Sequence, residues 1–151
     1  ELGLAGQRIG FLAISPAAPD RAQLQAGTTI TNRTLGFVNA PALMQLVIER
    51  ALDACVDMRG YIEARELLCD GLDEAGYEFV KPEGAFYVFP RTPVPDDVAF
   101  TKELQRENVL VVPGSGFGRE GHVRIAFCVA PAAIERAMPS FRKVKERVAR
   151  G

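Results

Sequence analysis

The sequence predicts an α/β fold in which helices pack on a small mixed or antiparallel sheet. Apolar residues recur at helical spacing in several long stretches, and short apolar runs stand between those stretches. Proline and glycine separate the two kinds of segment. From about residue 58 the expected order is helix, strand, strand, helix, strand, strand, helix. Such an alternation is typical of an α+β domain whose helices cover a sheet.

The beginning of the chain is expected to form one strand and one helix. The strand is expected over Arg8–Ile14 and is closed by Pro16. Asp20 is a good N-cap for a helix over about 21–32, because its carboxylate can accept a hydrogen bond from the first turn. Gly36 ends this helix.

A second long helical pattern leads to the expected domain boundary. It runs from about Pro41 to Ala54 and is followed by the polar tract 53–59. Because the character of the chain changes there, we expect one domain piece over 1–54 and a second domain over 55–151.

The second domain is expected to begin with a helix and a strand pair. The helix spans about Met58–Ala75, and Gly76 stands where a C-terminal cap belongs. Two short strands are expected over 77–80 and 85–89, joined by the turn Lys81–Gly84.

The remaining elements follow the same reasoning. The pair Asp96–Asp97 can cap a helix over about 98–107, after which 109–112 forms an apolar strand. A further strand is expected over 122–127, and a last amphipathic helix over about 131–148. The inward side chains of this last helix are expected to be Ile134, Met138, Phe141, Val144 and Val148.

Composition excludes several classes of protein. With 151 residues, 48% of them hydrophobic, and a net charge of −1, the chain lacks the basic excess of a nucleic-acid or membrane-surface protein. No apolar run reaches the roughly 20 residues that span a bilayer, and no secretory signal is recognised. Three scattered cysteines and one histidine predict no metal site. We expect a cytoplasmic protein, present here as a fragment or a processed piece.

Arg124 is the most informative residue of the sequence. It is a guanidinium inside an apolar strand pattern, shortly after the Gly-rich loop 113–118. Burying such a group is costly unless an anion meets it, and a carboxylate fits its two parallel donors. A solvated or salt-bridged surface arginine is the alternative interpretation of Arg124 taken alone.

Two further patterns carry weaker signals. Arg8 stands between Gly6 and Gly10, where small neighbours let a phosphate approach, although a structural salt bridge is equally compatible with this pattern. The stretch 116–121 reads G-x-G-x-x-G, but it runs into a strand, whereas a dinucleotide site needs a helix to begin there. We therefore do not expect a dinucleotide site.

Four segments, taken in order, resemble a known family. They are 3–10 (GLAGQRIG), 82–89 (PEGAFYVF), 108–118 (NVLVVPGSGFG) and 123–126 (VRIA). Together they are similar to the C-terminal part of class I/II pyridoxal-phosphate-dependent aminotransferases of fold type I, which are aspartate aminotransferase-like. The resemblance implies that 1–54 is the end of the large cofactor-binding domain with an interdomain helix. It also implies that 55–151 is the small C-terminal domain.

The resemblance also implies roles for individual residues. Arg8 would hold the phosphate of the cofactor pyridoxal 5'-phosphate, and Arg124 would grip the α-carboxylate of the amino-acid substrate. Gly84 and Phe86 match the family's G-x-F segment, which helps to position the small domain over the site. The Schiff-base lysine is expected immediately before Glu1, so that no catalytic residue is expected within this chain and no metal site is implied.

The resemblance further implies partners and leaves alternatives open. The substrates would be an amino acid and a 2-oxo acid, and the protein would be a homodimer with 35–39 near the subunit interface. Arg33 is a candidate for binding a side-chain carboxylate, or a solvated arginine at a helix end. Other fold type I enzymes, namely a β-lyase, a decarboxylase or a cyclase, share the carboxylate-binding arginine. A non-catalytic regulatory module of the same fold is the remaining alternative.

Overall fold

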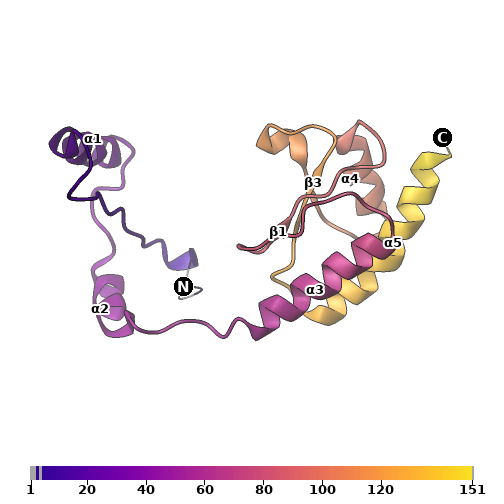
Figure 1. Cartoon of the computed structure of the whole chain (residues 1–151), viewed down its shortest axis with the longest axis horizontal. Helices are drawn as coiled ribbons and strands as arrows, with labels where there is room; N and C mark the ends of the chain where they lie inside the picture. The colour runs from indigo at the N-terminus through magenta and orange to yellow at the C-terminus, as the bar shows by residue number, and fades with distance from the viewer. Residues whose placement is uncertain (1–2, 4, 151) are drawn as a thin grey trace. The chain divides into compact units, whose positions relative to one another are not determined.

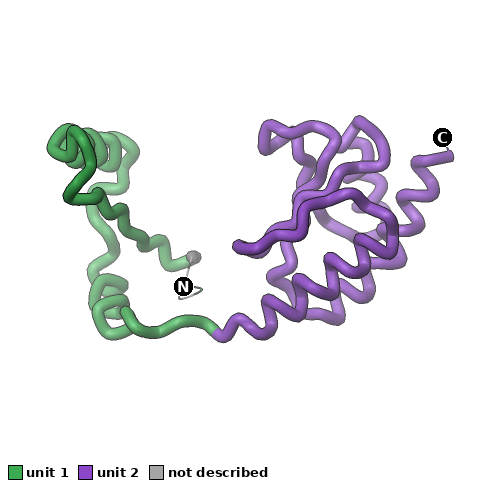
Figure 2. The backbone as a smooth tube through the Cα atoms, in the orientation of Figure 1, with its two compact units in different colours: residues 1–56 green, residues 57–151 purple. Residues whose placement is uncertain are grey.

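The computed structural model describes residue 3 and residues 5–150, and the chain divides into two compact units. Unit 1 comprises residues 1–56 and unit 2 comprises residues 57–151, as the two colours of Figure 2 show. Each unit is described by itself below.

Unit 1 consists of a short 3-10 turn, η1 (Ala5–Gln7), and two helices, α1 (Arg21–Thr34) and α2 (Ala42–Ala51). Both helices were expected, although α2 ends three residues early. In α1 the hydroxyls of four threonines donate to carbonyls one turn back, so that these hydroxyls are satisfied within the helix.

Two expectations for unit 1 are wrong. The segment Arg8–Ile14 forms no strand. A strand needs a ladder partner, and the described residues of unit 1 contain no other strand. Asp20 does not cap α1 with its side chain, because its backbone takes up a left-handed conformation at φ 55°.

None of the described residues of α1 or α2 is buried. Their apolar side chains lie on the surface of the unit, and Leu43 is 71% exposed. Helices of this length draw most of their stability from burying one face. Unit 1 therefore presents apolar faces that the unit itself does not cover. The large exposed apolar side chains of the two helices are Leu24, Ile30, Leu43, Leu46 and Val47.

Unit 2 is a layer of helices against a three-stranded sheet. The helices are α3 (Arg59–Glu74), α4 (Asp97–Arg106) and α5 (Pro131–Ala149), and α3 lies alongside α5 (Figure 1). The strands are β1 (Tyr87–Val88), β2 (Val112–Pro113) and β3 (Val123–Ala126), with the 3-10 turn η2 (Gly114–Phe117) between β2 and β3. This is the fold class predicted from the sequence.

The sheet is antiparallel in the order β1-β3-β2. Tyr87 pairs with Ala126 on one side of β3, and Val112 pairs with Arg124 on the other. Arg124 therefore stands on the central strand.

The strands are shorter than expected. The segment 77–80 forms no strand, 85–89 shortens to 87–88, and 109–112 contributes only Val112 to β2. The two ladders are confined to the residues opposite β3, and an isolated bridge joins Arg91 to His122. The Glu78 carbonyl accepts from the N–H of Arg91 at 2.8 Å without extending a ladder. Apolar content alone does not create this pairing.

The helix ends follow their sequence signals in unit 2. Gly76 adopts φ 70° and its N–H donates to the Asp73 carbonyl at 2.8 Å, while the Tyr77 N–H donates to the Leu72 carbonyl at 2.9 Å. These two bonds form the Schellman motif that the position of Gly76 predicted. At the start of α4 the Asp96 side chain accepts from the Ala99 N–H at 2.8 Å, as expected for an N-cap.

The core lies between the three helices and one face of the sheet. Tyr77 is buried at its centre, and its hydroxyl donates to the Phe141 carbonyl at 2.9 Å. Burial raises the pKa of the Tyr77 phenol, since the charged form would lose its hydration. Of the side chains expected to point inward from the last helix, four are buried and Val148 is partly buried. The buried members are Ile134, Met138, Phe141 and Val144.

Candidate functional site

The two faces of β3 carry different chemistry. Val123 and Ile125 are buried against the helices, whereas Arg124, which lies between them, is half-buried. Because side chains alternate across a strand, Arg124 projects from the opposite face of the sheet. The core on one face thus fixes the backbone from which the guanidinium projects on the other.

The guanidinium of Arg124 lies between two aromatic rings. Its central carbon is 4.0 Å from the ring centroid of Phe117 and 4.4 Å from that of Tyr87. Both distances are within the range of cation–π contact. In the described part of the chain, Arg124 makes no side-chain hydrogen bond or ion pair with a carboxylate. The rings hold the plane of the guanidinium while leaving its N–H donors without a protein anion.

Further aromatic side chains support these two rings. Phe86 lies 4.6 Å from Tyr87 between ring centroids, and Phe89 meets Phe117 edge to face at 6.4 Å. The His122 ring stacks on Phe89 at 5.6 Å with an interplanar angle of 12°. This face of the sheet is therefore an aromatic platform around one arginine.

The loop that carries Phe117 is held by backbone bonds. The Gly114 N–H donates to the His122 carbonyl at 2.8 Å, and the Arg119 N–H donates to the Gly114 carbonyl at 3.0 Å. A Cβ at position 114 would lie 2.3 Å from the Arg119 carbonyl oxygen, so that only glycine fits. The G-x-G-x-x-G stretch 116–121 overlaps the end of η2 and leads to β3, so that it runs into a strand as expected and opens no α-helix.

A buried carboxylate, that of Asp97, also holds the loop that carries Phe117. Asp97 is 3% exposed, and its Oδ2 accepts from the Ser115 N–H at 2.7 Å. Sequence reasoning missed this role, because it assigned both aspartates of the Asp96–Asp97 pair to capping α4. Asp96 alone caps the helix. The available signal was that one helix end needs one N-cap, which left the second aspartate unexplained.

Arg8 lies in unit 1, in the irregular segment after η1. Its residue is exposed and its φ is 55°. Around it, a Cβ built at Gly6 or at Gly10 would meet no other atom within 4 Å. The two glycines that flank Arg8 therefore leave space beside the backbone on either side of it. Arg8 and Arg124 belong to different units, and the geometry of each is defined within its own unit.

The remaining candidate residues lie beside β1, in the segment after α1 and in the last turn of α1. Phe86 precedes β1, and its carbonyl accepts from the Phe127 N–H at 3.0 Å, while Gly84 is exposed in the bend before it. The segment 35–39 is exposed, with Phe37 at 68%. Arg33 lies in the last turn of α1.

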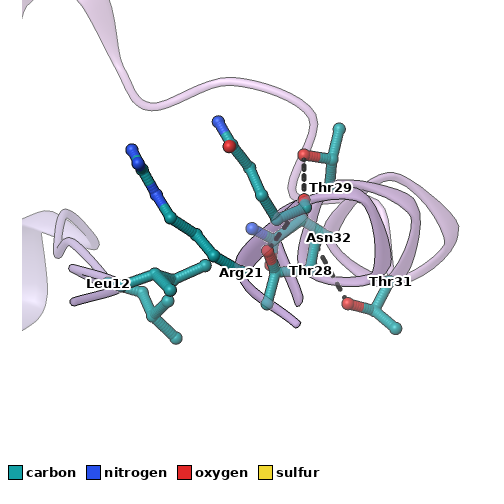
Figure 3. A pocket seen from close by; sticks show the side chains of 8 residues that line it. Leu12, Arg21, Thr28, Thr29, Thr31 and Asn32 are labelled. Carbon is teal, nitrogen blue, oxygen red and sulfur yellow. Dashed lines mark hydrogen bonds between the residues drawn. The ribbon is translucent and has the colours of Figure 1, made fainter. Parts of the chain in front are cut away.

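A pocket of about 510 Å³ opens in unit 1 between the segment after Arg8 and one face of α1. Leu12 and Arg21 line it together with several threonines (Figure 3). The hydroxyls of Thr28 and Thr29 already donate to helix carbonyls. Among the residues that line this pocket, Arg21 carries a charge, and its guanidinium is the main hydrogen-bond donor there. No cluster of three or more metal-ligating side chains occurs in residues 3 and 5–150, and no helix among them is long and apolar enough to cross a bilayer.

Comparison with known proteins identifies the family. Residues 1–141 match the family described as aminotransferase class I and II. The aromatic-amino-acid aminotransferase 2 of Thermococcus litoralis is 36% identical over 152 residues, covering 93% of this chain and 38% of that protein. The aspartate aminotransferase of Pyrococcus abyssi is 36% identical over 149 residues, with 93% and 38% covered.

A solved structure gives the same result. The crystal structure of an amino transferase from Eubacterium rectale superposes with a TM-score of 0.85 at 40% identity, covering 95% of this chain and 36% of that one. The chain thus spans little more than a third of the length of the proteins it matches. The family match over residues 1–141 and this superposition agree, and the chain belongs to the class I and II aminotransferase family.

Proposed function

We propose that the whole protein is a pyridoxal 5'-phosphate-dependent aminotransferase that moves an amino group between an amino acid and a 2-oxo acid. In this proposal Arg124 binds the α-carboxylate of the substrate and Arg8 binds the cofactor phosphate. The observation that carries it is the state of Arg124, whose guanidinium is held by two rings without a carboxylate partner in the described residues.

The geometry of Arg124 suits a carboxylate. A guanidinium presents parallel N–H donors in one plane, and a carboxylate accepts two of them at once. The rings of Phe117 and Tyr87 restrict that plane, so that less rotational freedom is lost when the anion binds. The rings also displace water from around the guanidinium, which strengthens the attraction to the anion.

The residues around Arg8 fit the phosphate end of the cofactor. A phosphate is bulkier than a carboxylate, and the open space around Gly6 and Gly10 leaves room for it beside the arginine. When bound, pyridoxal phosphate supplies an electron sink for the negative charge left at the substrate α-carbon. Arg8 would hold one end of the cofactor in place, and Arg124 would fix one end of the amino acid and orient its α C–H bond.

We propose for the two units the roles that the sequence resemblance implies for the two domains. Unit 1 is proposed to be the end of the large cofactor-binding domain, which is consistent with the uncovered apolar faces of its helices. Unit 2 is proposed to be the small domain that brings Arg124 to the substrate. We propose a homodimer with the exposed segment 35–39 near the interface. We propose a cytoplasmic location, with which the free state of Cys55, Cys69 and Cys128 is consistent.

The two relatives described above are named for aromatic amino acids and for aspartate, and we propose that the amino-acid substrate comes from one of these two groups. An enzyme for aspartate needs a second cation, and Arg33 stays the candidate for that role within this segment.

The test uses the full-length protein with pyridoxal phosphate, 2-oxoglutarate and either aspartate or phenylalanine. Formation of glutamate is expected, because a transaminase transfers the amino group to 2-oxoglutarate. The assay separates the alternatives, since a β-lyase, decarboxylase or cyclase would not produce glutamate. The variant Arg124→Gln is expected to lower kcat/KM about 100-fold, because a charge-assisted bidentate contact contributes about 3 kcal/mol. Arg106→Gln is the matched control, because Arg106 lies on the surface and pairs with Glu103. Unchanged kcat/KM in Arg124→Gln would refute the assignment.

A further inference from the structure

We infer that Asp97 is a positioning residue for the substrate-binding arginine and acts on it through the turn η2 and the ring of Phe117. The inference rests on the proposed role of Arg124 and adds to it the residue that fixes the orientation of the guanidinium. Asp97 touches neither substrate nor cofactor in this account.

The first step is the burial of the Asp97 carboxylate. At 3% exposure it has lost nearly all contact with water, and no ion pair joins it to a cation of the described residues. A carboxylate in such a place is expensive unless it is hydrogen-bonded. Its printed partner is the Ser115 N–H at 2.7 Å, the second residue of η2. The buried carboxylate of Asp97 therefore holds the backbone of this loop at Ser115.

The second step leads from the loop to the arginine. Ser115 and Phe117 belong to the same single turn, whose start is fixed because Gly114 has no room for a side chain. The Phe117 ring reaches the guanidinium of Arg124 at 4.0 Å although the residue is 48% exposed. The ring meets Phe89 edge to face and is otherwise held by the backbone of η2, so that a shift of that backbone moves the ring. Asp97 anchors this backbone at Ser115.

Adjacent Asp96 provides a contrast within the same helix end. Its carboxylate is exposed and accepts from the Ala99 N–H, which stabilises α4 without touching η2. Two neighbouring aspartates therefore serve different structures. Replacing either one removes a carboxylate that is bonded to a backbone N–H, so that Asp96→Ala is a matched control for Asp97→Ala.

The sign of the expected effect separates positioning from simple electrostatics. Removing a negative charge from the domain would, by Coulomb's law, strengthen the binding of an anion at Arg124. Loss of positioning predicts weaker binding instead. Loss of one cation–π contact corresponds to roughly a 3- to 30-fold change in a dissociation constant.

The experiment measures the dissociation constant of 2-oxoglutarate for the full-length holoenzyme by calorimetry. We expect about tenfold weaker binding in Asp97→Ala, binding within twofold of the parent in Asp96→Ala, and substantial recovery in Asp97→Asn, whose amide oxygen can still accept from Ser115. Phe117→Leu, at a half-exposed position, should weaken binding to a similar extent. The double variant Asp97→Ala/Phe117→Leu should be no weaker than the worse single variant, because both changes remove the same support.

Each outcome decides the inference. Additive effects in the double variant, unchanged or tighter binding in Asp97→Ala, or equal losses in Asp96→Ala and Asp97→Ala would overturn it. If Asp97→Ala does not fold, Asp97→Leu takes its place with the same expected weakening, because its side chain cannot accept from the Ser115 N–H, and unchanged binding in that variant overturns the inference. Arg124→Gln serves as the reference. Weaker binding in that variant, with none in Asp97→Ala or Phe117→Leu, overturns the positioning role alone, whereas unchanged binding overturns the proposed function and this inference together.

Discussion

Replacing Gly114 by alanine should loosen the loop beside Arg124. The added Cβ would lie 2.3 Å from the Arg119 carbonyl oxygen and 2.7 Å from that of His122. Ordinary contact requires about 3.5 Å, so that one of these backbone segments must move by about 1 Å. Such a shift takes the bond from Gly114 to His122, now 2.8 Å, and the bond from Arg119 to Gly114, now 3.0 Å, beyond useful length.

The magnitude follows from these two bonds. A backbone hydrogen bond contributes about 1 kcal/mol net, so that losing both lowers the local free energy of opening by about 2 kcal/mol. At 1.4 kcal/mol per factor of ten, this corresponds to roughly 30-fold faster amide exchange in the loop. Hydrogen exchange of the full-length protein, followed by mass spectrometry over residues 112–124, measures this rate.

Gly116 provides the matched control in the same turn. A Cβ at Gly116 would meet no other atom within 4 Å. Gly116→Ala should therefore leave exchange unchanged or slow it slightly, because alanine restricts the unfolded chain by less than about 1 kcal/mol. Equal exchange rates in the two variants would refute the steric reasoning. An unchanged rate in Gly114→Ala would do so as well.

Two further predictions concern the core of unit 2 and its last helix. Tyr77→Phe should cost about 1 kcal/mol near neutral pH, because the Phe141 carbonyl loses its donor. In the parent protein the pKa of Tyr77 is raised by burial, so that the stability it provides is present below about pH 10 and is lost as the pH rises above the unfolded value. Thermal unfolding between pH 8 and 11 should therefore show a shallower alkaline decline in Tyr77→Phe, and an identical slope would contradict the raised pKa. Pro139 stands inside α5, where it removes one helical hydrogen bond. Pro139→Ala should raise the midpoint of thermal unfolding, corresponding to about 1 to 3 kcal/mol, and a lower midpoint would show that the proline fits this helix without cost.

The sequence was most informative where hydrogen bonds are local. The helices α1, α3, α4 and α5 lie within two residues of their expected ends, since each backbone bond joins residues four apart. Gly76 and Asp96 were recognisable as caps for the same reason. Strands depend on partners far away in the chain, and this is why the expected strand over Arg8–Ile14 does not form and the strand over 85–89 is shorter than predicted.

The same distinction between local and long-range interactions applies to the candidate site. Arg124 could be found from the sequence, because a guanidinium in an apolar strand pattern calls for an anion, and its family resemblance is carried by short contiguous motifs. That Phe117 and Tyr87 enclose it, and that Asp97 anchors the loop from 18 residues away in sequence, is decided only by the tertiary structure. These contacts join segments that are far apart in the sequence. Local periodicity and spacing predict helices and strands but do not predict which distant segments come into contact. The sequence by itself therefore identified Arg124 and the family that the chain resembles. The packing of distant segments alone determined which residues hold the Arg124 guanidinium in place.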